Sequence, residues 1–111
     1  MINITVLRDR RDKICGLKVV GHAEFDIEGQ DIVCSAVSAI VQTAILGLTD
    51  VIGIRPHYSQ DKGMIDLEIS SELLQTKSNE ISIVTETTLL GLKSIELGYS
   101  EYITIEERKV E

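Results

Sequence analysis

Cys34 and His22, twelve residues apart, are the two side chains whose types and spacing could do chemistry together. An imidazole within hydrogen-bond reach of a thiol takes its proton and gives a thiolate–imidazolium pair. The thiolate can then attack a carbonyl carbon, and the imidazolium can return the proton to a leaving amine. This is the chemistry of a cysteine hydrolase, and it requires that the fold bring the two side chains together.

The segment that carries Cys34 has the pattern of a helix start. Asp31 precedes a helix-period apolar run and is predicted as the N-cap, which makes Ile32 the first helical residue and Cys34 the third. A thiol there lies near unpaired backbone N–H groups and the positive end of the helix dipole. Both favour thiolate, although the Asp31 carboxylate partly opposes them. The same N–H groups could bind an oxyanion, and Ser38, one turn later, is expected to line the pocket.

Hydrophobic periodicity predicts the elements that must position this pair. In chain order we expect strands 2–7 and 14–21 joined by a charged turn 8–13, a loop 23–30, a helix from 32 to about 50, a hairpin 54–70, a helix from 78 or 79 to 97, and a strand 99–106. The first helix should bury one apolar stripe: Val33, Val37, Ile40, Val41, Ala44, Leu48 and Val51. The order strand-strand-helix-strand-strand-helix-strand predicts a single α+β domain over 1–111, with one mixed or antiparallel sheet and two helices packed on it.

Composition disfavours several classes of function. The formal net charge of −7 argues against nucleic-acid binding. The basic run from Arg8 to Lys13 contains two aspartates and is interpreted as a solvated turn. The longest apolar stretch, 32–54, is interrupted by polar residues, and the alternating N-terminus does not resemble a signal peptide. A cytoplasmic protein that contacts no membrane is expected.

The residues leave two other uses of the cysteines open. A redox sensor would need an exposed Cys34 and a resolving thiol, but Cys15 lies in a strand pattern and is expected to be a small core residue. A metal site would combine Cys15, Cys34, His22 and His57, although their spacing matches no standard zinc pattern. His57, beside Pro56, is more simply a surface residue. No metal or other cofactor is expected.

The two segments around the candidate pair resemble a known signature. Gly21-His22-Ala23, an acidic loop, and Gly29-Gln30-Asp31-Ile32-Val33-Cys34-Ser35-Ala36-Val37-Ser38 are similar to the motif of the ribosomal-processing cysteine proteases, the Prp family. The resemblance extends over the whole chain. It implies that His22 and Cys34 form the catalytic dyad, with Gly21 and Gly29 as supporting motif positions and the intervening loop as a lid. Asp31 would cap the helix and fix Cys34.

The resemblance also implies a substrate and an assembly. The family removes an N-terminal extension, after an apolar Phe-containing stretch, from the ribosomal large-subunit protein numbered twenty-seven, and its members are α+β homodimers without a cofactor. Phe25 and Ile27 of the loop suit an apolar peptide. The loop carboxylates Glu24, Asp26 and Glu28 would suit basic residues of a ribosomal substrate, or simply form a solvated face. The alternative is a non-enzymatic ribosome-associated binding protein.

Overall fold

The computed structural model describes residues 1–21, 30–61 and 63–110, with the backbone alone for Gln30 and Asp31. Five strands form one sheet in the order β3-β4-β2-β1-β5. Their bounds are Ile2–Arg8 (β1), Ile14–Val20 (β2), His57–Asp61 (β3), Met64–Glu68 (β4) and Ile103–Lys109 (β5). The β1–β5 pair is parallel, whereas the other three strand pairs are antiparallel. The chain reaches β5 from β4 through helices on one face of the sheet, not through a hairpin turn. The sheet is therefore mixed, and the predicted α+β class is confirmed.

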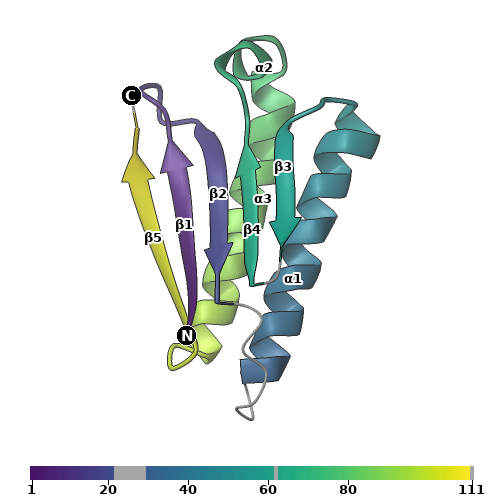
Figure 1. Ribbon diagram of the computed structural model, residues 1–111. Helices are drawn as coiled ribbons and strands as arrows, with labels where there is room; N and C mark the ends of the chain where they lie inside the picture. Colours follow the sequence, from purple (N-terminus) through teal and green to yellow (C-terminus); the bar gives the residue numbers. More distant parts are fainter. Residues whose placement is uncertain (22–29, 62, 111) are drawn as a thin grey trace.

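The helices cover one face of the sheet, as Figure 1 shows. Their bounds are Gln30–Leu46 (α1), followed by a π-helical turn Gly47–Ile52 (η1), then Ser71–Thr76 (α2) and Ser78–Gly98 (α3). Strand alternation turns Ile2, Ile4 and Val6 of β1 towards this face, where each is at most 1% exposed. The α1–α3 pair and the sheet thus enclose one hydrophobic core.

The apolar stripe of the first helix is largely as predicted but ends differently. Val33, Val37, Val41 and Ala44 of α1 and Leu48 of η1 are buried. Ile40 is half-buried, and its methyl groups lie where a Cβ on Gly91 of α3 would be in contact. Val51 is 84% exposed, so its assignment to the stripe was wrong. The wider π turn shifts the helical phase after Leu46 and rotates this position away from the sheet.

Two other boundaries differ from the prediction. The short helix α2 was not predicted, because six residues are too few to show a helical period. The sequence signal for this helix is its N-cap residue Ser70, whose Oγ accepts a hydrogen bond from the Leu73 N–H at 3.2 Å. The last strand starts at Ile103 rather than Tyr99. A turn that closes with a bond from the Tyr102 N–H to the Tyr99 oxygen precedes it.

Cys15 is a bulge residue in β2. Leu7 pairs with Gly16 and Arg8 with Ile14, so that Cys15 has no partner position on β1. The bulge lets both Ile14 and Leu17 face the helices and leaves Cys15 half-buried. The expectation that Cys15 is a core residue was therefore wrong, because the strand does not keep a strict two-residue alternation.

The segment Ile32–Ile52 is long and apolar enough to cross a bilayer, with a mean hydropathy of 1.9 over its most apolar window. The sequence analysis took the polar residues within 32–54 as interruptions that shorten this stretch, and this was wrong, because scattered Ser, Thr and Gln do not lower the mean hydropathy enough. In this fold one stripe of it packs on the sheet, and 33% of its most apolar window is buried inside the molecule.

Arg8 ties three elements together at the end of β1. Its guanidinium donates to Glu86 of α3 at 2.7 Å and to Glu107 of β5 at 2.9 Å, and also to the Asp12 backbone oxygen at 3.0 Å. The Arg8 side chain is only 15% exposed. The carboxylates, Glu86 first, raise the pKa of Arg8 well above its usual range. Hydrogen bonds from Lys93 and then Arg8 lower the pKa of Glu107.

Replacing Arg8 with Met should lower the free energy of unfolding by about 1–3 kcal/mol at pH 7, since two carboxylates lose a partly buried partner. Urea unfolding measures this. The stabilisation that Glu107 contributes is complete above the pKa of a glutamate in the unfolded chain, which is about 4.3. It is lost as the pH falls through the lower pKa that Glu107 has in the folded protein. The difference between Arg8→Met and the parent should therefore shrink at pH 3.

The matched control is Arg108→Met. Arg108 bonds only to the exposed Glu106 of its own strand among the described residues, so the substitution should change stability by less than about 0.5 kcal/mol. Equal losses for Arg8→Met and Arg108→Met would contradict the role of Arg8.

Candidate active site

Cys34 lies near the start of α1, as predicted, but one turn in rather than at the tip. The helix begins at Gln30, so that Asp31 is inside the first turn and Cys34 is the fifth helical residue. The assignment of Asp31 as the N-cap was therefore wrong. Because the influence of a helix terminus falls off within the first turn, the dipole favours a Cys34 thiolate less than the sequence suggested. The Asp31 side chain is outside the described residues.

The Cys34 side chain is also more buried than expected, with 2% of its surface exposed. It belongs to the hydrophobic core cluster with its neighbours Val33 and Val37. The burial of Val33 and Val37 fixes how α1 is rotated about its own axis. This rotation places Cys34 at the margin of the core rather than on the outer face of the helix. A peptide can reach the sulfur only after the atoms that cover it move.

Gly21 directly follows β2, which ends at the same end of the sheet at which α1 begins, as Figure 1 shows. Its φ of +93° is a conformation that L-residues rarely adopt, and its N–H donates to the Gly63 oxygen at 2.9 Å. A Cβ at this position would lie 2.4 Å from the Met1 carbonyl oxygen. The chain can thus leave β2 in this direction only with glycine here, immediately before His22.

His22 and Gly29 lie outside the described residues, as do the loop positions Phe25 and Ile27 and the loop carboxylates. The geometry of the His22–Cys34 pair therefore stays a prediction. What the described residues show is that β2 delivers the chain to the end of the molecule where Cys34 lies.

Ser38 is half-buried one helical turn after Cys34, on the same side of α1. Its Oγ accepts a hydrogen bond from the Gln42 side-chain amide at 2.8 Å. With the oxygen serving as acceptor here, the hydroxyl keeps one proton that it can donate elsewhere. The sequence analysis missed Gln42, although its spacing of four residues from Ser38 is a signal for such a contact.

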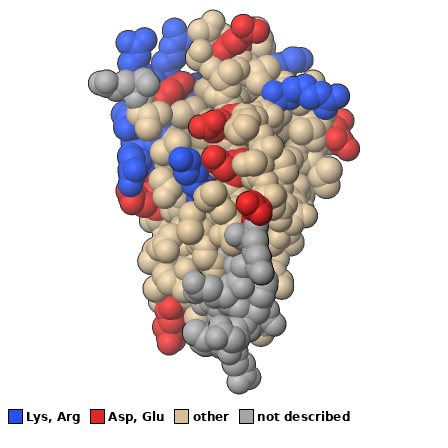
Figure 2. Space-filling model, in the orientation of Figure 1, with Lys and Arg blue, Asp and Glu red and all other residues tan. Residues whose placement is uncertain are grey.

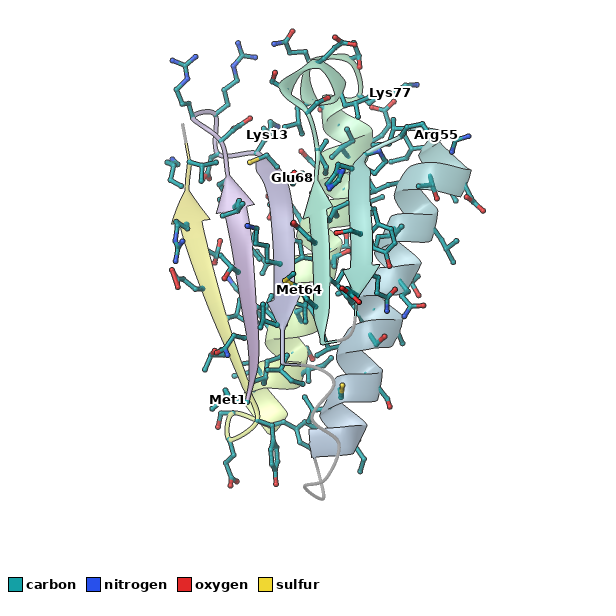
Figure 3. All side chains as sticks on the ribbon, viewed as in Figure 1. Met1, Lys13, Arg55, Met64, Glu68 and Lys77 are labelled. Carbon is teal, nitrogen blue, oxygen red and sulfur yellow. The ribbon has the colours of Figure 1, made fainter. Side chains whose placement is uncertain are left out.

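Exposed apolar side chains gather near the same end on the open face of the sheet. Val20 and Met64 are paired residues on β2 and β4, each 45% exposed, and Met1 is 47% exposed. Figure 3 shows Met1 and Met64 at the lower part of the sheet. Nothing in the sequence groups these three residues, since they come from three separate strands or strand ends.

The other cysteine chemistries have little support in the described residues. Cys15 is the second residue of β2 and therefore lies at the opposite end of that strand from the start of α1. Burial raises the pKa of the Cys15 thiol, which disfavours its thiolate. Cys34 is not exposed as a redox sensor would require. His57 is on the surface of β3, as predicted, and no cluster of three potential metal ligands occurs in the described part of the chain.

Comparison with known proteins gives a consistent result. Residues 1–104 match the family described as cysteine protease Prp. A relative from Staphylococcus aureus (strain Mu50), the ribosomal processing cysteine protease Prp, is 31% identical over 108 residues, which cover 95% of this chain and 97% of the relative.

Two crystal structures of an essential ribosomal processing protease Prp from S. aureus have the same fold. The one in complex with a substrate peptide has a TM-score of 0.87 at 24% identity, and the one with a covalently linked product peptide has a TM-score of 0.82 at 25% identity. Each comparison covers 96% of this chain and 99% of the other. The described fold, the position of Cys34 and these matches together show that the chain belongs to the Prp family of ribosomal-processing cysteine proteases.

Proposed function

We propose that the protein is a cysteine endopeptidase in which Cys34 is the nucleophile and His22 is the general base and acid. The observation that carries the proposal is the meeting of two segments at one end of the sheet. There Cys34 lies in the second turn of α1, and Gly21 follows β2 with a positive φ directly before His22. The covalently linked product in the related S. aureus protease supports attack by a protein nucleophile.

The proposed reaction follows acyl-transfer chemistry. His22 takes the Cys34 proton, and the sulfur attacks the scissile carbonyl to form a tetrahedral intermediate. The intermediate collapses to a thioester as the imidazolium gives its proton to the leaving amine. Water, deprotonated by His22, then hydrolyses the thioester and restores the thiol. The 2% exposure of Cys34 means that the first step follows an opening of the site by the bound peptide.

We propose the N-terminal extension of the ribosomal large-subunit protein numbered twenty-seven as the substrate, cleaved in the cytoplasm. The apolar group Met1, Val20 and Met64 suits the Phe-containing stretch before the cut. Beside it on the open face of the sheet, β3 and β4 carry carboxylates that suit basic residues of a ribosomal peptide. These are Asp61, Asp66 and Glu68, and Figure 2 shows the acidic groups on this face.

Substitution of the dyad should abolish cleavage of a peptide that carries the extension. Cys34→Ala should leave no detectable product, and His22→Ala should lower kcat/KM by about 10²–10⁴-fold, because the thiol loses its base. Mass spectrometry of the peptide measures both. The matched control is Cys15→Ala, which removes a thiol at the other end of β2 and should cleave normally.

The same experiment tests the alternative function. If Cys34→Ala retained the biological function and the parent protein left the peptide intact, the chain would be a non-enzymatic ribosome-associated binding protein. If Cys15→Ala lost cleavage and Cys34→Ala retained it, the nucleophile would be Cys15 and not Cys34.

Gly21→Ala should reduce activity beyond its cost in stability. The new Cβ would lie 2.4 Å from the Met1 carbonyl and force β2 to shift just before His22, so we expect kcat/KM to fall by at least roughly tenfold. Gly53→Ala is the matched control, because Gly53 also has a positive φ, of +84°, but a Cβ there meets nothing within 4 Å.

Both variants should lose about 1 kcal/mol from the backbone conformation alone, measured by urea unfolding. Only Gly21→Ala should also lose peptide cleavage at a temperature at which both are folded. Equal activities of the two folded variants would show that Gly21 does not position the site.

We also propose that the protein is a homodimer without direct contact to nucleic acid. Ile83, Leu90 and Leu97 of α3 are 68%, 67% and 88% exposed, and their seven-residue spacing places them on one face. Two copies of α3 packed through this face would bury three large apolar side chains from each chain. The formal charge of −7 supports the absence of nucleic-acid contact.

Leu90→Glu should convert the dimer to a monomer, because two buried carboxylates would face each other across the interface. Sedimentation equilibrium measures the mass, and Leu46→Glu, at a 56% exposed leucine of α1, is the control. A dimer that survives Leu90→Glu but dissociates in Leu46→Glu would place the interface on the other helix.

A further inference from the structure

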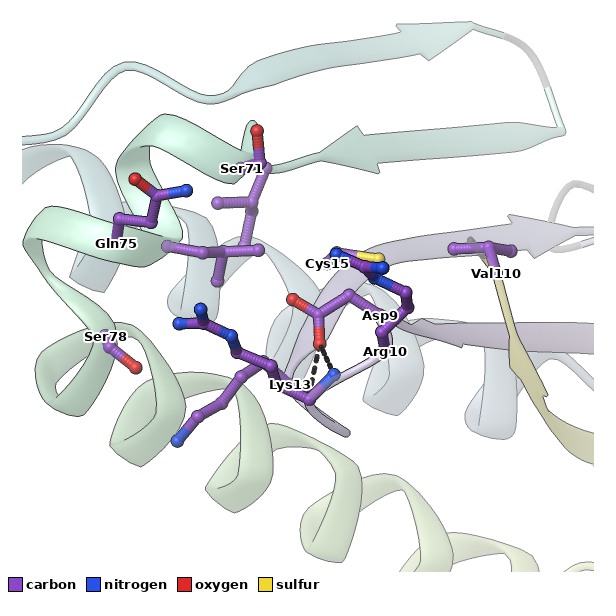
Figure 4. A pocket seen from close by; sticks show the side chains of 11 residues that line it. Asp9, Arg10, Lys13, Cys15, Ser71, Gln75, Ser78 and Val110 are labelled. Carbon is purple, nitrogen blue, oxygen red and sulfur yellow. Dashed lines mark hydrogen bonds between the residues drawn. The ribbon is translucent and has the colours of Figure 1, made fainter.

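A cavity of about 800 Å³ opens at the end of the sheet opposite the start of α1. The β1–β2 turn forms one wall of it, the short helix α2 and the first residue of α3 form another, and the end of β5 closes it with Val110. Figure 4 shows these elements around a common space. Its volume is in the range that holds a small organic ligand.

Three cationic side chains line this cavity, although the whole chain carries a net charge of −7. They are Arg10, Arg11 and Lys13 of the β1–β2 turn. None of them forms an ion pair with another described residue, whereas Arg8, Arg108 and Lys109 nearby are all paired. Figure 2 shows basic side chains gathered at this upper end of the molecule. The three cations are thus available to an external anion.

The acidic residue of the cavity is already used by the turn itself. The Asp9 carboxylate accepts the Arg11 N–H at 2.9 Å and the Lys13 N–H at 3.0 Å, as the dashed lines in Figure 4 mark. These bonds hold the turn that presents the cationic side chains. With one carboxylate against three cations, the lining residues that the structure describes have a formal charge of +2, which matches the dianion of a phosphate monoester at neutral pH.

The opposite wall adds neutral hydrogen-bonding groups. The side chains of Ser71, Gln75 and Ser78 line the cavity and make no side-chain hydrogen bond to any other residue that the structure describes. The floor is apolar, from Ile69, Leu74 and the half-buried Val110. A ligand that fills this space should therefore combine an anionic group with a compact organic body.

From these features we propose that the cavity bounded by Arg10, Arg11, Lys13, Ser71 and Ser78 binds a small phosphate monoester about the size of a nucleoside monophosphate. The cations contact the phosphoryl oxygens, and the hydroxyls and amide bind the organic part above the apolar floor. A concave site with an apolar floor suits such a molecule better than the backbone of an RNA, which needs a continuous basic track. The site is separate from the proposed peptidase centre, so either assignment can fail alone.

Isothermal titration calorimetry with AMP tests the proposal, with adenosine, inorganic phosphate and a single-stranded RNA oligomer as comparison probes. AMP should bind, adenosine should not, and inorganic phosphate should bind at least roughly tenfold more weakly because it leaves the floor uncovered. Arg11→Gln and Lys13→Gln should each weaken AMP binding by about tenfold, since each removes a charge-assisted contact. Arg108→Gln, at an arginine of β5 that pairs with Glu106 and is not among the described lining residues, should leave AMP binding unchanged.

Backbone amide shifts in NMR spectra locate the bound AMP. Signals of Ser71, Gln75 and Ser78 should move on titration, while those of α1 near Cys34 should stay in place. Arg11 is exposed and Lys13 half-buried, so both variants should keep the parental unfolding midpoint. Equal binding of adenosine or of inorganic phosphate, binding by the RNA oligomer without competition from AMP, or no effect of either variant would overturn the proposal.

Discussion

The packing of α1 on the sheet is the constraint from which the rest of the site follows. Val33, Val37 and Val41 are completely buried, and together they fix both the position and the rotation of the helix. Because Cys34 follows Val33 directly, that rotation also decides where its sulfur points and how much of it is covered. The proposed nucleophile is therefore positioned by core packing, which tolerates little movement in a close-packed interior.

The burial of Cys34 changes how its reactivity should be understood. A thiol one turn inside a helix and at the margin of an apolar core receives little help from the helix terminus. Burial in an apolar core disfavours the thiolate form of a cysteine, so the proposed imidazole of His22 has more to contribute here than at an open helix tip. The low exposure also protects the thiol from oxidation when no peptide is bound.

The order of the five strands and the two long helices and most of the core were predictable from the sequence because they rest on local periodicity. The alternation in residues 2–7 and the stripe from Val33 to Leu48 both appear in the structure as predicted. The bulge at Cys15 and the π turn before Val51 were not predictable in this way, since each changes the phase of a pattern without a clear local signal. For the site, the sequence indicated Cys34, Ser38 and Gly21. It did not reveal that Gly21 lies against the Met1 carbonyl, because this contact depends on the pairing of β1 with β2.

The close contact between Met1 and Gly21 has a practical consequence for work with this protein. The first residue of the chain is part of the end of the molecule that holds the proposed peptidase site, whereas the last strand ends at the other pole (Figure 1). An affinity tag fused ahead of Met1 would emerge beside the proposed substrate-binding surface and could itself compete as a peptide. A tag placed after β5 keeps that surface clear.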